Sequence, residues 1–230
     1  MPRPDSIVAA LIVLACLASV QAFAAQGFKF GQDEEADRAD KEARQARIDE
    51  QLSTPCRASL KDKKIMVVIG VRQSNGYIAA QQQNYGAHFQ AINSRLRALG
   101  LRTYTPDEIR RQIAQAEIDA YFRNDPDAML SASKRLGASF ILRGLVSSQA
   151  TENRLIAVNQ VSVNMKFTLY GSDGRFISDQ EASSASYAGA DVERMALTLV
   201  NEKADEVVPA LYADYCRKAG PGAARKPAPQ

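Results

Sequence analysis

The sequence is poor in the residues from which most catalytic and metal sites are built. Among 230 residues it has one histidine, His88, three cysteines and no tryptophan. A single histidine cannot form a histidine-based metal cluster, and the sequence contains no HExxH, paired CxxC or EF-hand pattern. The acidic residues Asp107, Asp125 and Asp173 are better explained by helix starts and a turn. We therefore expect no catalytic residue, no metal ligand and no cofactor.

An excess of charge of one sign is also missing. Lys and Arg number 29 and Asp and Glu 26, and the basic residues are dispersed without interleaved aromatics. Such a pattern does not track a phosphate backbone, so nucleic acid is not expected as a partner. The loop from Gly70 to Gly76 lacks the lysine and the serine or threonine of a phosphate-binding loop, which argues against a nucleotide.

Long apolar runs are absent except at the start of the chain. Arg3 precedes an apolar stretch over residues 7–20, and Ala22-Phe23-Ala24 offers small residues for a peptidase. The run is short of the roughly 20 residues that a spanning helix needs, so residues 1–24 are predicted to be a signal peptide for export to the periplasm.

Cys16 allows a second interpretation of the same segment. Residues 13–16, Val-Leu-Ala-Cys, loosely resemble the site at which bacterial lipoproteins are cleaved and lipidated, although Leu14 is larger than usual there. Lipidation at Cys16 would tether the protein to the outer membrane. In the alternative, Cys16 is an ordinary apolar residue of the signal, cleavage follows Ala24 and no membrane tether exists.

Cys56 and Cys216 remain after the signal. An even pair in an oxidising compartment suggests a disulfide, which would join the two ends of the folded part. Two unpaired thiols are the alternative, because sequence cannot supply the geometry of the bond.

The rest of the chain predicts one α/β domain with a mixed sheet, in the order β-α-β-α-α-β-β-β-α. Residues 25–54 are a charged helical or flexible spacer, residues 55–216 the domain, and residues 217–230 a disordered tail rich in Pro, Gly and Ala. The expected elements are a central strand at 65–69, a helix at 84–99, a short strand at 101–104, helices opened by Thr105-Pro106 and Asp125-Pro126, strands between 138 and 187, and a closing helix at 191–215 kinked by Pro209. Gly171 to Gly174 predicts a tight hairpin turn, and a change of apolar parity predicts a bulge or a break near Asn159-Gln160.

Two polar stretches are candidate partner surfaces. The first follows the central strand and comprises Arg72, Gln73, Ser74 and Asn75. The second lies on the serine-rich returning strand, expected to be an exposed sheet edge, and comprises Ser178, Gln180 and Ser184. An edge strand of this kind accepts another strand through its main chain, or is kept polar simply to prevent aggregation.

The segments KIMVVIGV, LGLRTYTPDEI, RLGASFILRG and LYGSDGRF, with the closing helix, resemble a bacterial envelope superfamily. It includes the curli-secretion lipoprotein (CsgG-like), the lipoprotein activators of penicillin-binding proteins (LpoB-like) and the amino-terminal domain of TolB. The resemblance covers roughly residues 61 to 215. Residues 137–144 look like the family's "gadylitG" strand, and Ser172 to Arg175 like its "xxDGxx" turn.

The resemblance implies a non-enzymatic domain that docks onto envelope proteins, whose identity it does not supply, in assembly or regulation of an envelope system. A self-assembling, curli-type secretion component, and hence a homo-oligomer, is one alternative. The connections at 150–154 and 171–174 are short, whereas curli-type pores carry long insertions there. An enzyme that uses carboxylates or His88 in an unrecognised arrangement is the other alternative.

Overall fold

The computed structural model describes residues 30–82, 86–153, 158–188 and 191–220. The predicted signal peptide, the lipidation predicted at Cys16 and residues 221–230 of the predicted tail lie outside the described residues. The chain divides into two compact units, Met1–Ala43 and Arg44–Gln230. Helix α2 (Phe30–Ser53) crosses this boundary; half of its 24 residues are charged, and from Glu34 on most are exposed. The second unit contains the sheet and the remaining helices.

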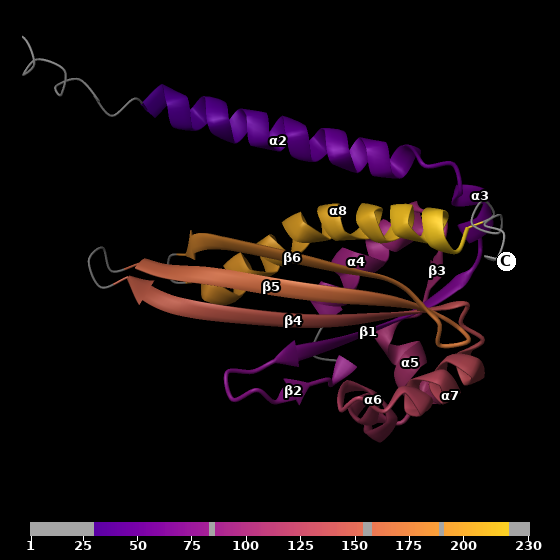
Figure 1. Ribbon diagram of the computed structural model, residues 1–230. Coiled ribbons are helices and arrows are strands. Elements are labelled where there is room, and N and C mark those ends of the chain that lie inside the picture. The colour runs from indigo at the N-terminus through magenta and orange to yellow at the C-terminus, as the bar shows by residue number, and fades with distance from the viewer. Residues whose placement is uncertain (1–29, 83–85, 154–157, 189–190, 221–230) are drawn as a thin grey trace, which may run out of the picture. The chain divides into compact units, whose positions relative to one another are not determined.

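A six-stranded mixed sheet forms the centre of this unit (Figure 1). Its strands are β1 (Lys64–Arg72), β2 (Ile78–Ala79), β3 (Arg102–Thr103), β4 (Phe140–Asn153), β5 (Val158–Gly171) and β6 (Phe176–Ala188). The order is β2-β1-β4-β5-β6, and β3 also pairs with β1. Strand β1 is parallel to β3 and β4, whereas β4, β5 and β6 form an antiparallel meander. The predicted α/β class with a mixed sheet is confirmed.

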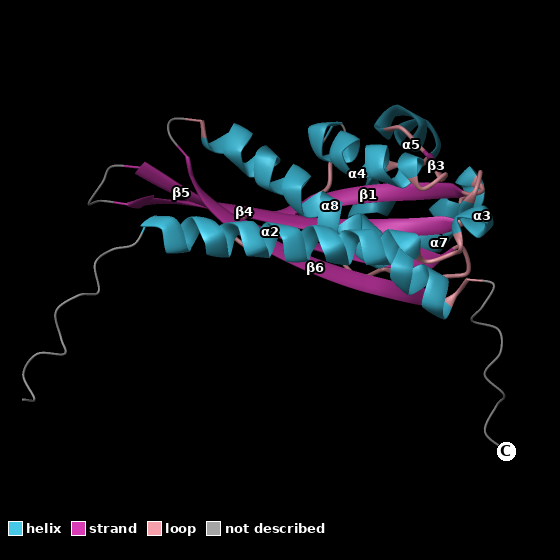
Figure 2. Ribbon diagram, turned by 90° about the horizontal axis from the view of Figure 1, so that it is seen from above, coloured by secondary structure: helices cyan, strands magenta, loops and turns pink. Residues whose placement is uncertain are grey.

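Helices cover the two faces of the sheet unequally. They are α3 (Arg57–Leu60), α4 (Gly86–Ala98), α5 (Pro106–Gln112), α6 (Gln115–Phe122), α7 (Pro126–Leu136) and α8 (Val192–Lys218). Helices α4 and α8 pack on one face, with α8 running across β5 and β6, as Figure 2 shows from above. Helices α5, α6 and α7 lie on the opposite side, near β1 (Figure 1). The second face of β5 and β6 is therefore left open over much of its length.

The apolar pattern explains this division. Residues 65–69 of β1 are all buried, as expected for a central strand covered on both faces. Strand β5 alternates instead: Val163, Met165 and Phe167 are buried, whereas Asn164 and Lys166 between them are exposed. Successive strand residues point to opposite faces, so the apolar half of β5 meets α8 and the polar half meets solvent.

Local signals in the sequence set several boundaries as predicted. The Thr105 hydroxyl accepts the N–H of Glu108 at 3.2 Å, and the Glu108 carboxylate accepts the N–H of Thr105 at 2.7 Å. Asp125 caps α7 through the N–H of Asp127. In the β5–β6 turn the N–H of Gly174 donates to the carbonyl of Gly171 at 3.0 Å.

Two sequence predictions were wrong: the number of helices between β3 and β4, and the position of the bulge. Three helices, not two, separate β3 from β4, because Ile113 is extended (φ −125°, ψ 124°) and the Glu117 carboxylate accepts the N–H of Ala114 to start α6. The bulge is also elsewhere. Strands β4 and β5 pair without interruption from Val158, and the irregularity lies between β5 and β6 at Leu169/Tyr170. There the extra residue lets adjacent residues of β6, Ile177 and Ser178, both be buried.

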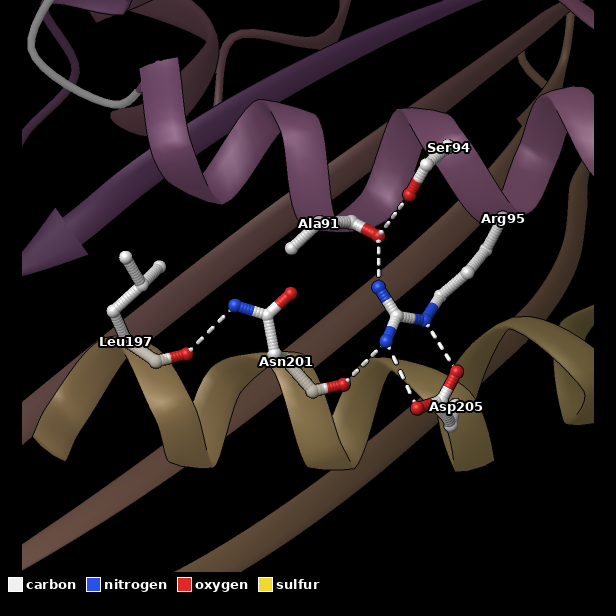
Figure 3. Close-up of polar contacts among 6 residues, drawn as sticks. All are labelled: Ala91, Ser94, Arg95, Leu197, Asn201 and Asp205. Atoms are coloured by element: carbon white, nitrogen blue, oxygen red, sulfur yellow. Dashed lines mark hydrogen bonds and ion pairs between the residues drawn. The ribbon is translucent and has the colours of Figure 1, made fainter. Parts of the chain in front are cut away.

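Two long-range links hold helices of this unit together. A disulfide joins Cys56 to Cys216, with Cα atoms 5.7 Å apart across 160 residues, so the pairing predicted for these cysteines is present. Beside it, the Tyr212 hydroxyl accepts the N–H of Cys56 at 3.3 Å. Figure 3 shows the second link, in which Arg95 of α4 reaches the carboxylate of Asp205 on α8 at 2.6 and 2.9 Å.

Candidate functional site

A polar groove in the described part of the chain is large enough to hold a ligand. It encloses about 750 Å³, within the range of small-molecule sites. Its lining comes from the end of β1 and three adjacent strands: Arg72, Gln73, Ser74, Ser147, Ser148, Gln149, Ser162, Val163, Asn164, Ser183, Ser184 and Ala185. A separate apolar cavity in the core has about 20 Å³, enough for one water and no more.

Strand register lines up the groove residues in rows. In one row, Arg72 on β1 pairs with Ser147 on β4. Ser147 pairs in turn with Asn164 on β5, and Asn164 with Ser183 on β6. The next row on the same face, two residues further along each strand, joins Gln149, Ser162 and Ala185. One side of the meander thus presents hydroxyl and carboxamide groups in a regular lattice.

The connection between β1 and β2 forms one side of the groove, and its shape is set by local contacts. The N–H of Gln73 donates to the carbonyl of Tyr77 at 2.8 Å, and Gly76 adopts a positive φ of 82°. The Asn75 side-chain oxygen accepts the N–H of Tyr77 at 2.9 Å, so this asparagine shapes the turn. Gln73 and Ser74 are thereby held beside the floor.

Gln82 supports this arrangement from below, and the sequence did not reveal it. It belongs to the polar run Gln81-Gln82-Gln83-Asn84, whose composition is typical of an exposed loop, yet Gln82 is completely buried. Its side-chain amide accepts the N–H of Ile69 at 2.9 Å and donates to the carbonyl of Ile69 at 2.8 Å. Gln82 thus acts as a strand partner for β1 just before Arg72. No signal in the sequence distinguishes it from its neighbour Gln81.

Arg72 is the one charged residue of the groove lining, and it is exposed. Within the described residues its guanidinium has no ion pair or hydrogen bond. Beside the groove, Lys166 pairs with Asp179 at 3.4 Å, and the Glu181 carboxylate accepts a hydrogen bond from the neutral Asn164 at 3.1 Å. The charge within the lining itself is therefore the positive charge of Arg72, and the negative charge of Glu181 lies next to the lining.

The structure brings some predicted surface residues together and separates others. Arg72, Gln73, Ser74 and Ser184 all line the groove, although more than a hundred residues separate the first three from the last. Asn75 belongs to the adjoining turn.

Ser178 and Gln180 lie elsewhere. Ser178 is completely buried and donates to the Asp214 carboxylate of α8 at 2.6 Å, and Gln180 donates to the same carboxylate at 3.1 Å. The expectation that Ser178 lies on an exposed edge is therefore wrong. The helix α8 covers this end of β6, and its acidic side chain needs hydrogen-bond donors from the strand.

Asp214 is the best-satisfied carboxylate of the described residues. Burial by itself raises its pKa, but hydrogen bonds from Ser178 and Arg217 and the charge of Lys218 outweigh this and hold the pKa below its ordinary value. All of its partners are protein groups that also anchor the end of α8. We interpret the cluster as a structural contact between α8 and β6.

Nothing in the described chain adds a catalytic centre to the groove. His88 is half-buried on α4, where burial lowers its pKa, and it is not a groove residue. Groups of three or more His, Cys, Asp or Glu side chains suited to a metal ion do not occur in the residues described. Among the helices of that same portion, none is long and apolar enough to cross a membrane.

Comparison with known proteins finds distant resemblances in solved structures. PelC from Paraburkholderia phytofirmans, crystallised as a dodecamer, is 17% identical with a TM-score of 0.38, covering 64% of this chain and 88% of PelC. A minor lipoprotein from Acinetobacter baumannii is 11% identical with a TM-score of 0.39, covering 67% and 94%. The LpoB C-terminal domain from Escherichia coli is 12% identical with a TM-score of 0.34, covering 62% and 95%.

Neither a family model nor a curated protein matches the sequence. At these identities, and with these three TM-scores below 0.5, the comparisons assign the chain to no family.

Proposed function

We propose that this chain is a non-enzymatic binding domain that works in the bacterial periplasm, or at the outer membrane if Cys16 is lipidated, in the assembly or regulation of an envelope system. The observation that carries the proposal is the polar groove, which gathers Arg72 and two serine-rich strands on a rigid sheet. Functional contacts are commonly made by such surface segments on a stable scaffold.

Export is supported by the signal-like first 24 residues and by the Cys56–Cys216 bond, since disulfides persist in oxidising compartments. A binding role rather than catalysis is supported by the groove's composition. Its lining holds six serines but no His, Asp, Glu or Lys that could act as a general base beside them. The sequence resemblance to envelope docking domains points the same way.

The test is site-specific photo-crosslinking in living cells. A photoreactive residue at Ser74 or Ser184 is expected to give a discrete adduct with an envelope protein, whereas one at the exposed Arg97 of α4 is not. Adducts of equal pattern from all three positions, or none from the groove, would contradict docking through this surface.

Export is tested separately by the mass of the mature chain. A new N-terminus at Ala25, or a lipidated one at Cys16, agrees with the proposal. An intact chain that begins at Met1 in the cytosol would refute it.

A further inference from the structure

The groove differs from an ordinary protein-binding pocket in its lack of apolar anchors. Only Val163 and Ala185 among the twelve lining residues are apolar, whereas nine carry a hydroxyl or a carboxamide. Protein interfaces concentrate their binding energy in buried aromatic and aliphatic side chains, which this floor does not offer. A ligand that presents many hydroxyl groups suits the lining better, because each serine, asparagine or glutamine both donates and accepts.

Most of that hydrogen-bonding capacity is unused within the protein. Of the side-chain donors in the lining, Asn164 is engaged with Glu181 at 3.1 Å and Ser162 with the carbonyl of Gln149 at 3.5 Å. In the part of the chain that is described, the hydroxyls of Ser147 and Ser183 form no such bond, whereas Ser184 pairs with the buried Val163 and belongs to the other face of the sheet. The rows defined by strand register therefore expose a lattice of free donors and acceptors.

Two exposed tyrosines belong to segments that also contribute lining residues, although neither tyrosine is itself part of the lining. Tyr187 follows Ser183 and Ala185 at alternate positions of β6, so the three residues share a face, and 58% of Tyr187 is exposed. Tyr77 lies next to Gln73 across the β1–β2 turn and is 55% exposed. An aromatic ring combines a broad apolar face with a polar end. Beside a polar floor, such a face can stack on the C–H face of a sugar ring.

Arg72 favours a ligand that carries a negative charge. Its guanidinium is exposed, is unpaired within the described residues and heads the row that continues through Ser147, Asn164 and Ser183. Guanidinium groups bind carboxylates through two parallel hydrogen bonds, which makes a carboxylate the matching ligand group.

We propose that the groove binds a segment of a carboxylated oligosaccharide. Arg72 pairs with a sugar carboxylate, the serine and amide rows bond the sugar hydroxyls, and Tyr77 and Tyr187 stack on rings at the margins. This inference rests on the proposed function as a binding domain and adds the class of ligand that the groove takes.

The probe is a hexamer of galacturonic acid, titrated into the purified mature protein by calorimetry and by NMR. We expect binding that shifts the amide signals of the groove strands. The carboxyl-reduced hexamer is expected to bind at least about tenfold more weakly, because it keeps the hydroxyls and loses the partner of Arg72.

Variants separate recognition from general electrostatic attraction. Arg72→Gln and Tyr187→Ala are each expected to weaken binding about tenfold, and Ala185→Trp, which fills the floor with an exposed side chain, to abolish it. Arg97→Gln removes the same charge from the exposed surface of α4 and is expected to leave affinity unchanged. Circular dichroism confirms that each variant is folded.

Several results would overturn the inference: no binding at millimolar hexamer, equal affinity for the carboxyl-reduced hexamer, or displacement of the sugar by an equally charged glutamate peptide. Binding that survives Ala185→Trp would also exclude the groove as the site. These outcomes are distinct from failure of the proposed function. If crosslinking captures a protein through Ser74 or Ser184 while the hexamer does not bind, docking stands and the ligand class is wrong.

Discussion

At Gly144 on β4 the fold leaves no room for a side chain. Gly144 pairs with Phe167 across β4 and β5, and a Cβ atom added to it would lie 2.5 Å from Cε1 of that buried ring. Gly144→Ala is therefore expected to lower the free energy of unfolding by about 2 kcal/mol, measured by urea denaturation. Gly86→Ala, where an added Cβ meets nothing within 4 Å, is the control. Equal stability of the two variants would contradict the packing argument.

Asp214 makes a prediction about pH. Because its folded pKa is below the ordinary value, its carboxylate stabilises the fold at neutral pH, and this contribution is lost as the pH falls through the folded pKa. Asp214→Asn is expected to be less stable than the wild type by about 2 kcal/mol at pH 7, with a smaller difference at pH 3. Urea unfolding at both pH values measures this. Asp179→Asn, which removes only an exposed ion pair, should change stability by less than about 1 kcal/mol.

At the scale of elements, α4 and α8 are joined through Arg95 (Figure 3). Besides the Asp205 carboxylate, the guanidinium donates to the carbonyls of Ala91 at 2.6 Å and Asn201 at 2.8 Å. Arg95→Ala is expected to cost about 2 kcal/mol, more than Asp205→Ala, because the latter leaves the two carbonyl contacts in place. Asp205 is largely exposed, so a double-mutant cycle should give a coupling below about 1 kcal/mol that decreases with salt. A coupling of several kcal/mol would show that the ion pair dominates instead.

At the scale of the whole molecule, the disulfide connects the start of the folded unit to the end of α8. A loop of 160 residues closed by one bond gives about 5 kcal/mol in the chain-entropy model. Cys56→Ser with Cys216→Ser is expected to lose a large part of this, seen as a lower urea midpoint, and reductant should lower the wild type to the same value. If reductant leaves the wild-type midpoint unchanged, the bond is absent or contributes nothing.

Features that depend on neighbouring residues could be predicted from the sequence. The buried run at 65–69, the caps at Thr105 and Asp125 and the turn at Gly171 to Gly174 depend on neighbours within a few residues, and each was predictable. Sequence reasoning failed at Ile113, where a buried apolar residue continues the helical spacing but adopts an extended backbone. It failed again at Gln82 and Ser178, because a polar side chain in the sequence carries no sign of the buried partner that it will meet.

The sequence by itself determined the class of the domain, its strongest strand, its caps and turns, and the pair of cysteines available for a crosslink. Only the tertiary structure decided which polar residues form a surface. Arg72 and Ser183 become neighbours through three successive strand pairings, and Ser178 leaves the surface because α8 places Asp214 over it. Local elements follow from short-range spacing and capping, whereas the groove follows from strand register and helix packing, which join residues distant in the chain.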